Sequence, residues 1–304
     1  MKIFLNFDKA GAEWVVVAYL SGDARMLDVV ENGKKPHVVT GNLIFGVPDN
    51  LILAEKELIG ELRNPVEIEE LRQSIPDLST GGYFLPRTMS VYQAGKKSNH
   101  ALNYGETYRV FALYNEMDES EAKRIVDFYH EKAYPSISVW HESIRRELKR
   151  DRTLTNCFGR KVVLRDTWGP HLFKAGYAFK PQSTVVDMVN RALRRLYEEE
   201  IDGFRYTVPK AQVHDSILAQ TELPNNHAGW VRLASVCMSV DSWMSPTCRY
   251  GSREFTVKTD MKLGPNWGRM SEVKLAGFKD PDALGWKLEE AWDGLHAIEM
   301  QKAG

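Results

Sequence analysis

The stretch GKKSNHALNYGETY, residues 95–108, decides the fold and function predicted for this sequence. In a helix, Lys96, His100, Tyr104 and Tyr108 are four positions apart and share one face. That face is cationic at one end and aromatic at the other, and it lacks the aliphatic residues of a core-facing stripe. It suits a ligand that carries both phosphate and a flat ring. A solvated amphipathic face is the alternative that these four residues leave open.

The composition limits the classes of protein. Hydrophobic residues make up 43% and charged residues 27%, as in an ordinary globular protein. The net charge is −1, so any phosphate-binding surface must be local. Three isolated cysteines argue against a zinc ribbon or a disulfide framework. The N-terminus reaches an aspartate too early for a signal peptide, and no apolar run is long enough to span a bilayer. We therefore expect a cytoplasmic protein with no membrane segment.

The hydrophobic pattern predicts an α+β fold in which a helical block is inserted between strands. KIFLNFD predicts a strand that ends at Asp8, and a second apolar run, EWVVVAYLSG, follows it. Strand composition flanks His214 and Asp215 and recurs at 253–267. A β-hairpin is expected around Gly159.

Helical signals fill much of the remaining chain. They run through 89–149 and return at 181–200 and 280–300. Residues 46–87 are rich in Gly, Pro and charge, so we expect an excursion there with one short helix near 65–74.

Two aspartates stand at strand positions, where a carboxylate is costly unless it is paired or binds a metal. Asp8 ends one apolar run and Asp215 interrupts another. Brought together, the two carboxylates would repel each other unless a hard divalent cation lay between them. Mg²⁺ suits this place because it needs few protein ligands and takes the rest from phosphate and water. The alternative is two aspartates that are each hydrogen-bonded locally.

In chain order, these features resemble family A DNA polymerases, the bacterial DNA polymerase I type and its phage relatives. DKAGAEWVVVAYLSGD is similar to motif A of that family, GKKSNHALNYGETY to motif B, and QVHDS to motif C. Between B and C, CFGRKVVL and PQSTVVDMVNRAL fall where the family has its Phe-Gly-Arg-Arg hairpin and its Gln-containing palm helix. LGPNW resembles the family's C-terminal end, and the resemblance spans about residues 3–267.

The resemblance implies a polymerase palm, an antiparallel sheet with helices, with an inserted helical fingers subdomain. It places the palm with motif A at 1–45, an insertion or connector at 46–87, the fingers with motif B at 88–156, and the palm with motif C at 157–267. Residues 268–304 would form a C-terminal extension with an amphipathic helix. We expect the thumb to be absent from this chain.

The implied activity is template-directed transfer of deoxynucleotides from dNTPs to the primer 3′-hydroxyl of primer-template DNA with two Mg²⁺ ions. Asp8 and Asp215 would bind both ions, and the backbone carbonyl of Lys9 would help to hold the second. Glu13 falls at the steric gate that excludes a ribose 2′-hydroxyl.

The motif B residues would hold the incoming nucleotide. Lys96 falls at the arginine that grips the triphosphate, Tyr104 lies beside the sugar, and Tyr108 would stack at the templating position. His100 stands where the family has the lysine that protonates pyrophosphate. A histidine, with an ordinary pKa of ~6.5, can do so only if the triphosphate raises its pKa. Lys97 is the next candidate for this acid.

Further residues would contact DNA. His214 would touch the primer terminus, Gln182 would face the minor groove of the duplex, and Arg160 would contact the backbone. Lys174 stands where an arginine is usual. Ser216 replaces the glutamate that normally follows the motif C aspartate, so we expect one nearby carboxylate fewer.

Only seven residues precede Asp8, where the family carries a thumb and often an exonuclease. We therefore expect a second polypeptide with the thumb and possibly an exonuclease, docked on the apolar face of the helix at 280–300. A native start upstream of Met1 is the plainer alternative. Two other functions stay open: a single-subunit RNA polymerase, against which Glu13 argues, and a non-catalytic DNA-binding or replication accessory protein.

Overall fold

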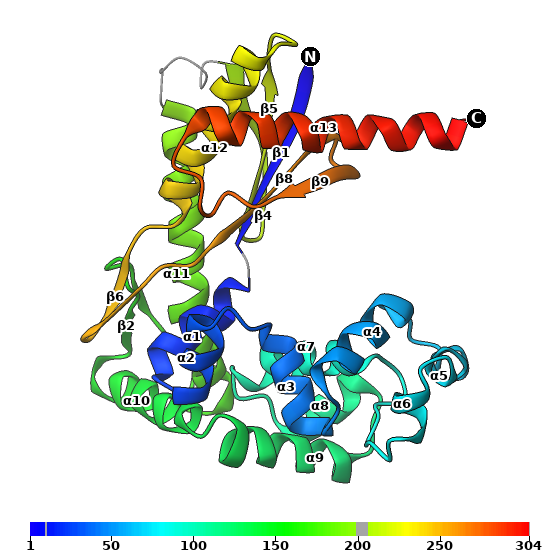
Figure 1. The fold of residues 1–304 in the computed structure, drawn as a ribbon. Helices are drawn as coiled ribbons and strands as arrows, with labels where there is room; N and C mark the ends of the chain where they lie inside the picture. The colour runs from blue at the N-terminus through cyan, green and yellow to red at the C-terminus, as the bar shows by residue number, and fades with distance from the viewer. Residues whose placement is uncertain (10, 199–205, 304) are drawn as a thin grey trace. The chain divides into compact units, whose positions relative to one another are not determined.

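The computed structural model describes residues 1–9, 11–198 and 206–303 and divides into two compact units (Figure 1). The sheet unit comprises Met1–Ala12 and Gln182–Gly304, and the helical unit comprises Glu13–Pro181. The predicted α+β class with an antiparallel sheet is confirmed. Within the described ranges, no helix is both long and apolar enough to cross a bilayer.

The sheet unit is built on five antiparallel strands in the order β4-β5-β1-β8-β9. The central strand β1 pairs with β5 on one side and with β8 on the other, so Asp8 lies opposite both Ser216 and Asp260. The strands are β1 (Lys2–Lys9), β4 (Thr207–Val213), β5 (Ser216–Glu222), β8 (Thr259–Asn266) and β9 (Arg269–Val273), with a separate hairpin of β6 (Cys248–Tyr250) and β7 (Arg253–Phe255).

One face of the sheet forms the core. In β1, Ile3, Leu5 and Phe7 are fully buried, because alternate side chains of a strand point to the same face. This face packs against apolar side chains of three helices (Figure 1). They are the C-terminal half of α11 (Pro170–Glu198), α12 (His227–Met244), which the sequence pattern did not predict, and α13 (Pro281–Ala303).

The apolar face of α13 belongs to this core. Leu284 and Leu288 are fully buried, and Trp292 lies 6.1 Å from Trp230 of α12, measured between ring centroids. The prediction that this face docks a second polypeptide is therefore wrong for these residues, since α12 already covers them. Ile298 lies outside the residues whose side chains are described.

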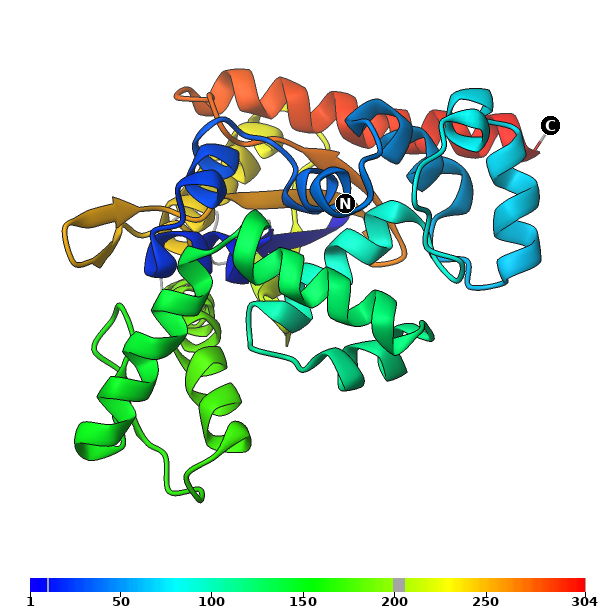
Figure 2. The ribbon, with the colours of Figure 1, turned by 90° about the horizontal axis from the view of Figure 1, so that it is seen from below.

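The helical unit holds the remaining helices and one small hairpin. In Figure 2, the green helices α10 and α11 lie side by side, and Arg145 and Lys180 hydrogen-bond across them to Tyr177 and Glu147. The elements are α1 (Ala12–Ser21), α2 (Ala24–Glu31), α3 (Pro36–Phe45), α4 (Asp49–Ile59), α5 (Pro65–Gln73), α6 (Pro76–Thr80), α7 (Val91–Leu102), α8 (Tyr108–Asn115), α9 (Glu119–Phe128), the π-helix η1 (Tyr129–Ala133), α10 (Ser136–Asp151), β2 (Thr153–Thr155), β3 (Lys161–Val163) and the first part of α11.

One local prediction needs correction. The excursion at 46–87 contains three helices, α4, α5 and α6, and not only the one predicted near 65–74. The apolar run EWVVVAYLSG, to which the sequence analysis gave no element type, falls in helix α1. The compact units also divide the chain differently from the motif-based boundaries, because residues 13–45 and 157–181 pack within the helical unit.

A buried ion pair ties the excursion to the start of α7. Arg72 is 2% exposed and its Nε donates to the fully buried Glu55 carboxylate at 2.8 Å. The same guanidinium donates to the carbonyls of Pro86 (2.7 Å) and Met89 (3.1 Å). Glu55 also accepts from the backbone N–H of Val91 at 2.7 Å. The short helices are therefore stabilised by tertiary contacts rather than by their own length.

Gly95 allows α3 to pack directly against α7. A Cβ at this position would lie 2.3 Å from the carbonyl oxygen of His37 and 2.9 Å from the nitrogen of Gly41. Only a glycine permits two backbones to approach so closely. The first residue of the GKKSNHALNYGETY stretch thus fixes the place of the helix that carries Lys96 and His100.

Candidate active site

Three carboxylates gather near the end of the central strand of the sheet unit. Asp8 pairs with Ser216, the residue after Asp215, on one side and with Asp260 on the other. Burial, together with the negative charges of Asp215 and Asp260, raises the pKa of Asp8 to about 6, and the charge of Lys262 opposes this rise. The site therefore carries negative charge that the nearby lysine does not fully balance.

The motif C aspartate lies in a strained turn. His214 and Asp215 connect β4 to β5 as a two-residue turn, and Ser216 Oγ donates to the carbonyl of Val213 at 2.9 Å. His214 has φ +53°, in the left-handed region that few non-glycine residues adopt. Such backbone conformations cluster at functional sites. Here the turn places Asp215 next to the neighbouring strand β1.

Asp260 is a carboxylate that the sequence analysis missed. The Ser216 substitution led us to expect one nearby carboxylate fewer, but β8 supplies Asp260 directly opposite Asp8. Like charges at directly opposed strand positions are destabilising, so the pair is a candidate for a role beyond folding. A carboxylate inside an apolar strand was the signal that identified Asp8 and Asp215, and the same signal exists at Asp260.

Metal binding by the carboxylate pair is chemically reasonable. Across the described part of the chain, no three His, Cys, Asp or Glu side chains are placed to hold a metal together. Asp8 and Asp215 are two oxygen-donating carboxylates, and such a pair suits a hard ion that needs few protein ligands and completes its shell with water and phosphate, as Mg²⁺ does. Burial is the main cause of the raised pKa of Asp8, and the charges of Asp215 and Asp260 add to it; a bound cation would offset that repulsion.

The Lys9 side chain is buried on the opposite face of the strand from Asp8. It is 1% exposed, and its Nζ donates to the carbonyl of Val257 at 2.6 Å, to Thr259 Oγ1 at 3.0 Å and to Ser245 Oγ at 3.2 Å. Burial lowers the pKa of Lys9 to about 8. The ammonium group thus fastens the end of β1 to the start of β8, a role that the sequence did not reveal.

In the helical unit, the predicted stripe is interrupted after His100. Helix α7 ends at Leu102, and Gly105 adopts φ +70°. The N–H of Glu106 bonds to the carbonyl of Ala101 and that of Gly105 to the carbonyl of Leu102, which is a Schellman cap. Only Lys96 and His100 therefore share α7, while Tyr104 lies in the capping turn and Tyr108 begins α8. The prediction of one continuous helical stripe is wrong because the glycine ends the helix.

Tyr104 and Glu13 are nevertheless brought together. The Tyr104 hydroxyl donates to the Glu13 carboxylate near the start of α1. Burial, followed by the charge of Glu13, raises the pKa of Tyr104 far above its ordinary value, so the hydroxyl keeps its proton and remains a donor. Two residues predicted from separate motifs to face the nucleotide sugar thus form one hydrogen-bonded pair.

His37 lies beside the predicted phosphate-binding residues. Its ring centroid is 6.0 Å from that of His100, and its Nδ1 is 3.1 Å from Asn99 Nδ2. Burial, followed by the charges of His100, Lys96 and Lys56, lowers the pKa of His37 to about 4. His37 of α3, whose imidazole is neutral, and Lys56 of α4 therefore lie near Lys96 and His100 of α7. Only the α3–α7 packing shows this, because His37 lies far from His100 in the sequence.

The other predicted residues have varied surroundings. Lys174 forms an ion pair with Glu106, and Arg109 Nε donates to the Tyr108 hydroxyl at 3.2 Å. Burial lowers the pKa of Lys97. The remaining three predicted DNA contacts are exposed: Arg160, Gln182 and His214.

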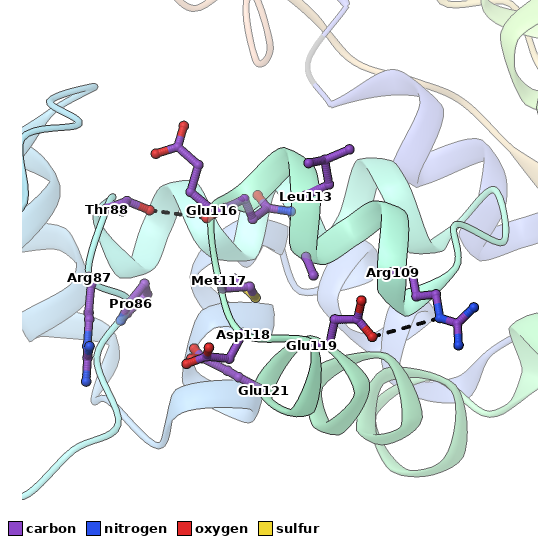
Figure 3. A pocket seen from close by; sticks show the side chains of 12 residues that line it. Pro86, Arg87, Thr88, Arg109, Leu113, Glu116, Met117, Asp118, Glu119 and Glu121 are labelled. Carbon is purple, nitrogen blue, oxygen red and sulfur yellow. Dashed lines mark hydrogen bonds and ion pairs between the residues drawn. The ribbon is translucent and has the colours of Figure 1, made fainter.

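A pocket of about 650 Å³ lies between residues 86–88 and helices α8 and α9 (Figure 3). Four carboxylates and two guanidinium groups line it, and Arg109 pairs with Glu119 at 3.8 Å. Lys96, His100 and Tyr104 are absent from its lining. Its carboxylate-rich wall disfavours a triphosphate, so this pocket is not the nucleotide site.

The chain is similar in sequence to known DNA polymerases. No protein-family model matches it. A DNA polymerase of Mycobacterium phage D29 is 23% identical over 232 residues, 75% of this chain. DNA polymerase I of Streptococcus pneumoniae is 22% identical over 72% of the chain, and the thermostable DNA polymerase I of Thermus aquaticus is 22% identical over 78%. The chain spans less than a third of the length of these relatives, 30%, 22% and 24% respectively.

The fold is also similar to that of a solved structure. The POL domain of Pol1 from M. smegmatis, solved in complex with DNA primer-template and dNTP, superimposes with a TM-score of 0.62 at 16% identity. The match covers 87% of this chain and 40% of that one. The predicted resemblance to family A DNA polymerases is confirmed. Asp8 at the start of motif A lies beside motif C on the sheet unit, whereas motif A from Glu13 onward and motif B, which forms α7 with its capping turn, belong to the helical unit.

Proposed function

We propose that this chain is the catalytic part of a template-directed DNA polymerase that adds deoxynucleotides to a primer 3′-hydroxyl. The observation that carries the proposal is the apposition of Asp8, near the end of β1, and Asp215, in the adjacent β4–β5 turn, where their repulsion contributes to the raised pKa of Asp8. The sheet unit would serve as the palm and the helical unit as the fingers. The similarity to DNA polymerase I and a phage DNA polymerase supports this assignment.

Asp8 and Asp215 would hold two Mg²⁺ ions, with the backbone carbonyl of Lys9 as a further ligand. Bound ions of this kind lower the pKa of an attacking hydroxyl and stabilise a leaving pyrophosphate. The contribution of the chain is to fix the two carboxylates. The β4–β5 turn holds Asp215, and the buried Lys9 side chain anchors the strand that carries Asp8.

The helical unit would bind the nucleotide. Lys96 and His100 would contact the triphosphate, and His100 would donate the proton to pyrophosphate. Support comes from the shared helix α7 and from the adjacent His37 and Lys56. Tyr104 and Glu13 would read the sugar, since the hydrogen bond from the tyrosine hydroxyl would hold the Glu13 side chain in the space of a 2′-hydroxyl.

Tyr108 would stack at the templating position, and primer-template DNA would contact a local basic segment. Residues 145–174 contain nine Lys and Arg against three Asp and Glu, a net charge of +6 in a chain whose total is −1. Arg160 and Lys174 belong to this segment, while Gln182 and His214 would contact the duplex from the sheet unit. Phosphate contacts of this kind make binding fall steeply with salt concentration.

Completion of the polymerase by a second polypeptide with a thumb and possibly an exonuclease is a separate proposal. The covered face of α13 removes the docking surface that we had predicted for it. Co-purification from the native source tests the idea, and processive synthesis by the homogeneous 304-residue chain would contradict it.

Primer extension with Mg²⁺ tests the proposed function. We expect incorporation of dNTPs in preference to rNTPs at a recessed primer end. Preference for rNTPs would favour the single-subunit RNA polymerase alternative, and DNA binding without any incorporation would favour an accessory protein. In the same assay, the variant Glu13→Ala should have a smaller dNTP-to-rNTP incorporation ratio than wild type.

A further inference from the structure

The turn that carries Tyr104 is held from several sides. The backbone carbonyl of Asn103 lies 2.8 Å from His141 Nε2, and Asn103 Oδ1 accepts from the Tyr129 hydroxyl at 2.9 Å. On the other side of the turn, the Glu106 carboxylate pairs with Lys174. The residues that flank Tyr104 are thus fixed by contacts from α10, η1 and α11.

His141 and Tyr177 form a stacked platform beneath this turn. Their ring centroids are 3.8 Å apart and their planes differ by 13°. A Cβ on Gly105 would lie 3.0 Å from the Tyr177 ring and 3.6 Å from His141 Cε1, so the turn rests directly on both rings. Arg145 Nε donates to the Tyr177 hydroxyl at 2.6 Å and holds the lower ring in place.

The contact with the Asn103 carbonyl fixes the protonation state and tautomer of the His141 imidazole. His141 is 6% exposed, and burial lowers its pKa to about 4, so the ring is neutral near pH 7. A carbonyl oxygen only accepts, so Nε2 must carry the proton. The neutral ring therefore presents its single N–H to the residue next to Tyr104.

We propose that His141 is a positioning residue that sets the place of the Tyr104 hydroxyl and thereby the selectivity for the nucleotide sugar. The inference rests on the proposed function, in which Tyr104 and Glu13 read the sugar. Loss of the N–H leaves the buried carbonyl of Asn103 without this donor, and the turn shifts to recover a partner. The Tyr104–Glu13 bond moves with it, whereas the carboxylates Asp8 and Asp215 keep their own supports.

The experiment compares sugar selectivity among variants of two neighbouring histidines. His141→Leu removes the donor, His141→Gln keeps an amide N–H for the same carbonyl, and His130→Leu is the control. His130 is half-buried on the π-helix η1, 5.9 Å from His141 between ring centroids, and it is not the donor to the Asn103 carbonyl. The readouts are the kcat/KM ratios of dNTP to ddNTP and of dNTP to rNTP on one primer-template.

We expect His141→Leu to change these ratios about tenfold, the factor that one buried hydrogen bond supplies. His141→Gln should restore them to within about threefold, and His130→Leu should keep wild-type ratios even if its overall rate falls. Unchanged ratios in an active, folded His141→Leu would overturn the inference. If that variant does not fold, Tyr177→Leu removes the ring beneath His141, and unchanged ratios there overturn it equally.

Two results distinguish failure of the proposed function from failure of the role of His141. A wild-type chain that incorporates no nucleotide would contradict the proposed function and this inference with it. A wild-type chain that incorporates nucleotides, beside variants of unaltered selectivity, would contradict the inference alone.

Discussion

Gly95→Ala is the substitution whose consequence follows most directly from the packing. The new methyl group would lie 2.3 Å from the carbonyl oxygen of His37, whereas ordinary contact begins at 3.4 Å. One of the two helices must therefore move by about 1.1 Å, because the obstructing atoms belong to the α3 backbone and cannot rotate away. The nitrogen of Gly41, at 2.9 Å, blocks a second direction.

Two opposing contributions set the change in the free energy of unfolding caused by Gly95→Ala. Overpacking of this kind costs up to about 3 kcal/mol, and we take this upper value because backbone atoms obstruct the methyl group. Alanine recovers about 1 kcal/mol through its higher helix propensity. The expected net loss is therefore about 2 kcal/mol. Since α7 also carries Lys96 and His100, a displacement near 1 Å should slow nucleotide incorporation by up to about 100-fold.

Hydrogen–deuterium exchange of peptides from α3 and α7 gives the stability of this packing, and single-nucleotide incorporation gives the rate. Gly169→Ala is the matched control, because a Cβ there meets nothing within 4 Å. Its stability should stay within about 0.5 kcal/mol of wild type. A Gly95→Ala chain with wild-type exchange and wild-type rate would refute the argument that Gly95 sets the position of α7.

Three further perturbations address other parts of the molecule. Arg72→Met leaves the Glu55 carboxylate buried without its guanidinium and should cost about 3–5 kcal/mol in urea unfolding; a loss below about 1 kcal/mol would contradict the role of the pair. The hydrogen bond to Asp282 raises the pKa of His227 above 6.5, so its stabilising effect is complete below pH 6.5 and fades as the pH rises through the folded-state pKa. The melting temperature lost in His227→Gln should accordingly be larger at pH 5.5 than at pH 8.5, and a pH-independent loss would exclude this linkage. His100→Ala should lose most of kcat while His100→Lys keeps it, and a fully active alanine variant would show that another group donates the proton to pyrophosphate.

Features carried by short-range pattern were predictable from the sequence. The strand that ends near Asp8 follows from period-two alternation, and the hairpin around Gly159 follows from its turn chemistry. The helix near 65–74 likewise shows a local start signal, with Asn64 as its N-cap and Pro65 in its first turn.

Features that depend on contacts between distant segments were not predictable. Asp260 joins Asp8 only through the β1–β8 register, and His37 joins His100 only because Gly95 admits α3. The short helix α4 carries little signal of its own and is held by the buried Glu55–Arg72 pair. Local pattern therefore singled out Asp8, Asp215 and the stripe at 96–108, the resemblance to family A polymerases supplied the other predicted residues, and tertiary packing supplied the side chains that surround them.

The central claim is that the Asp8 and Asp215 carboxylates serve nucleotidyl transfer. Its most direct test is the rate of Mg²⁺-dependent addition of one dNTP to a recessed primer by wild type, by Asp215→Asn and by Asp28→Asn, an exposed aspartate in the helical unit. We predict incorporation by wild type and Asp28→Asn and a loss of at least about 1,000-fold in Asp215→Asn. Incorporation by Asp215→Asn at the wild-type rate would contradict the account.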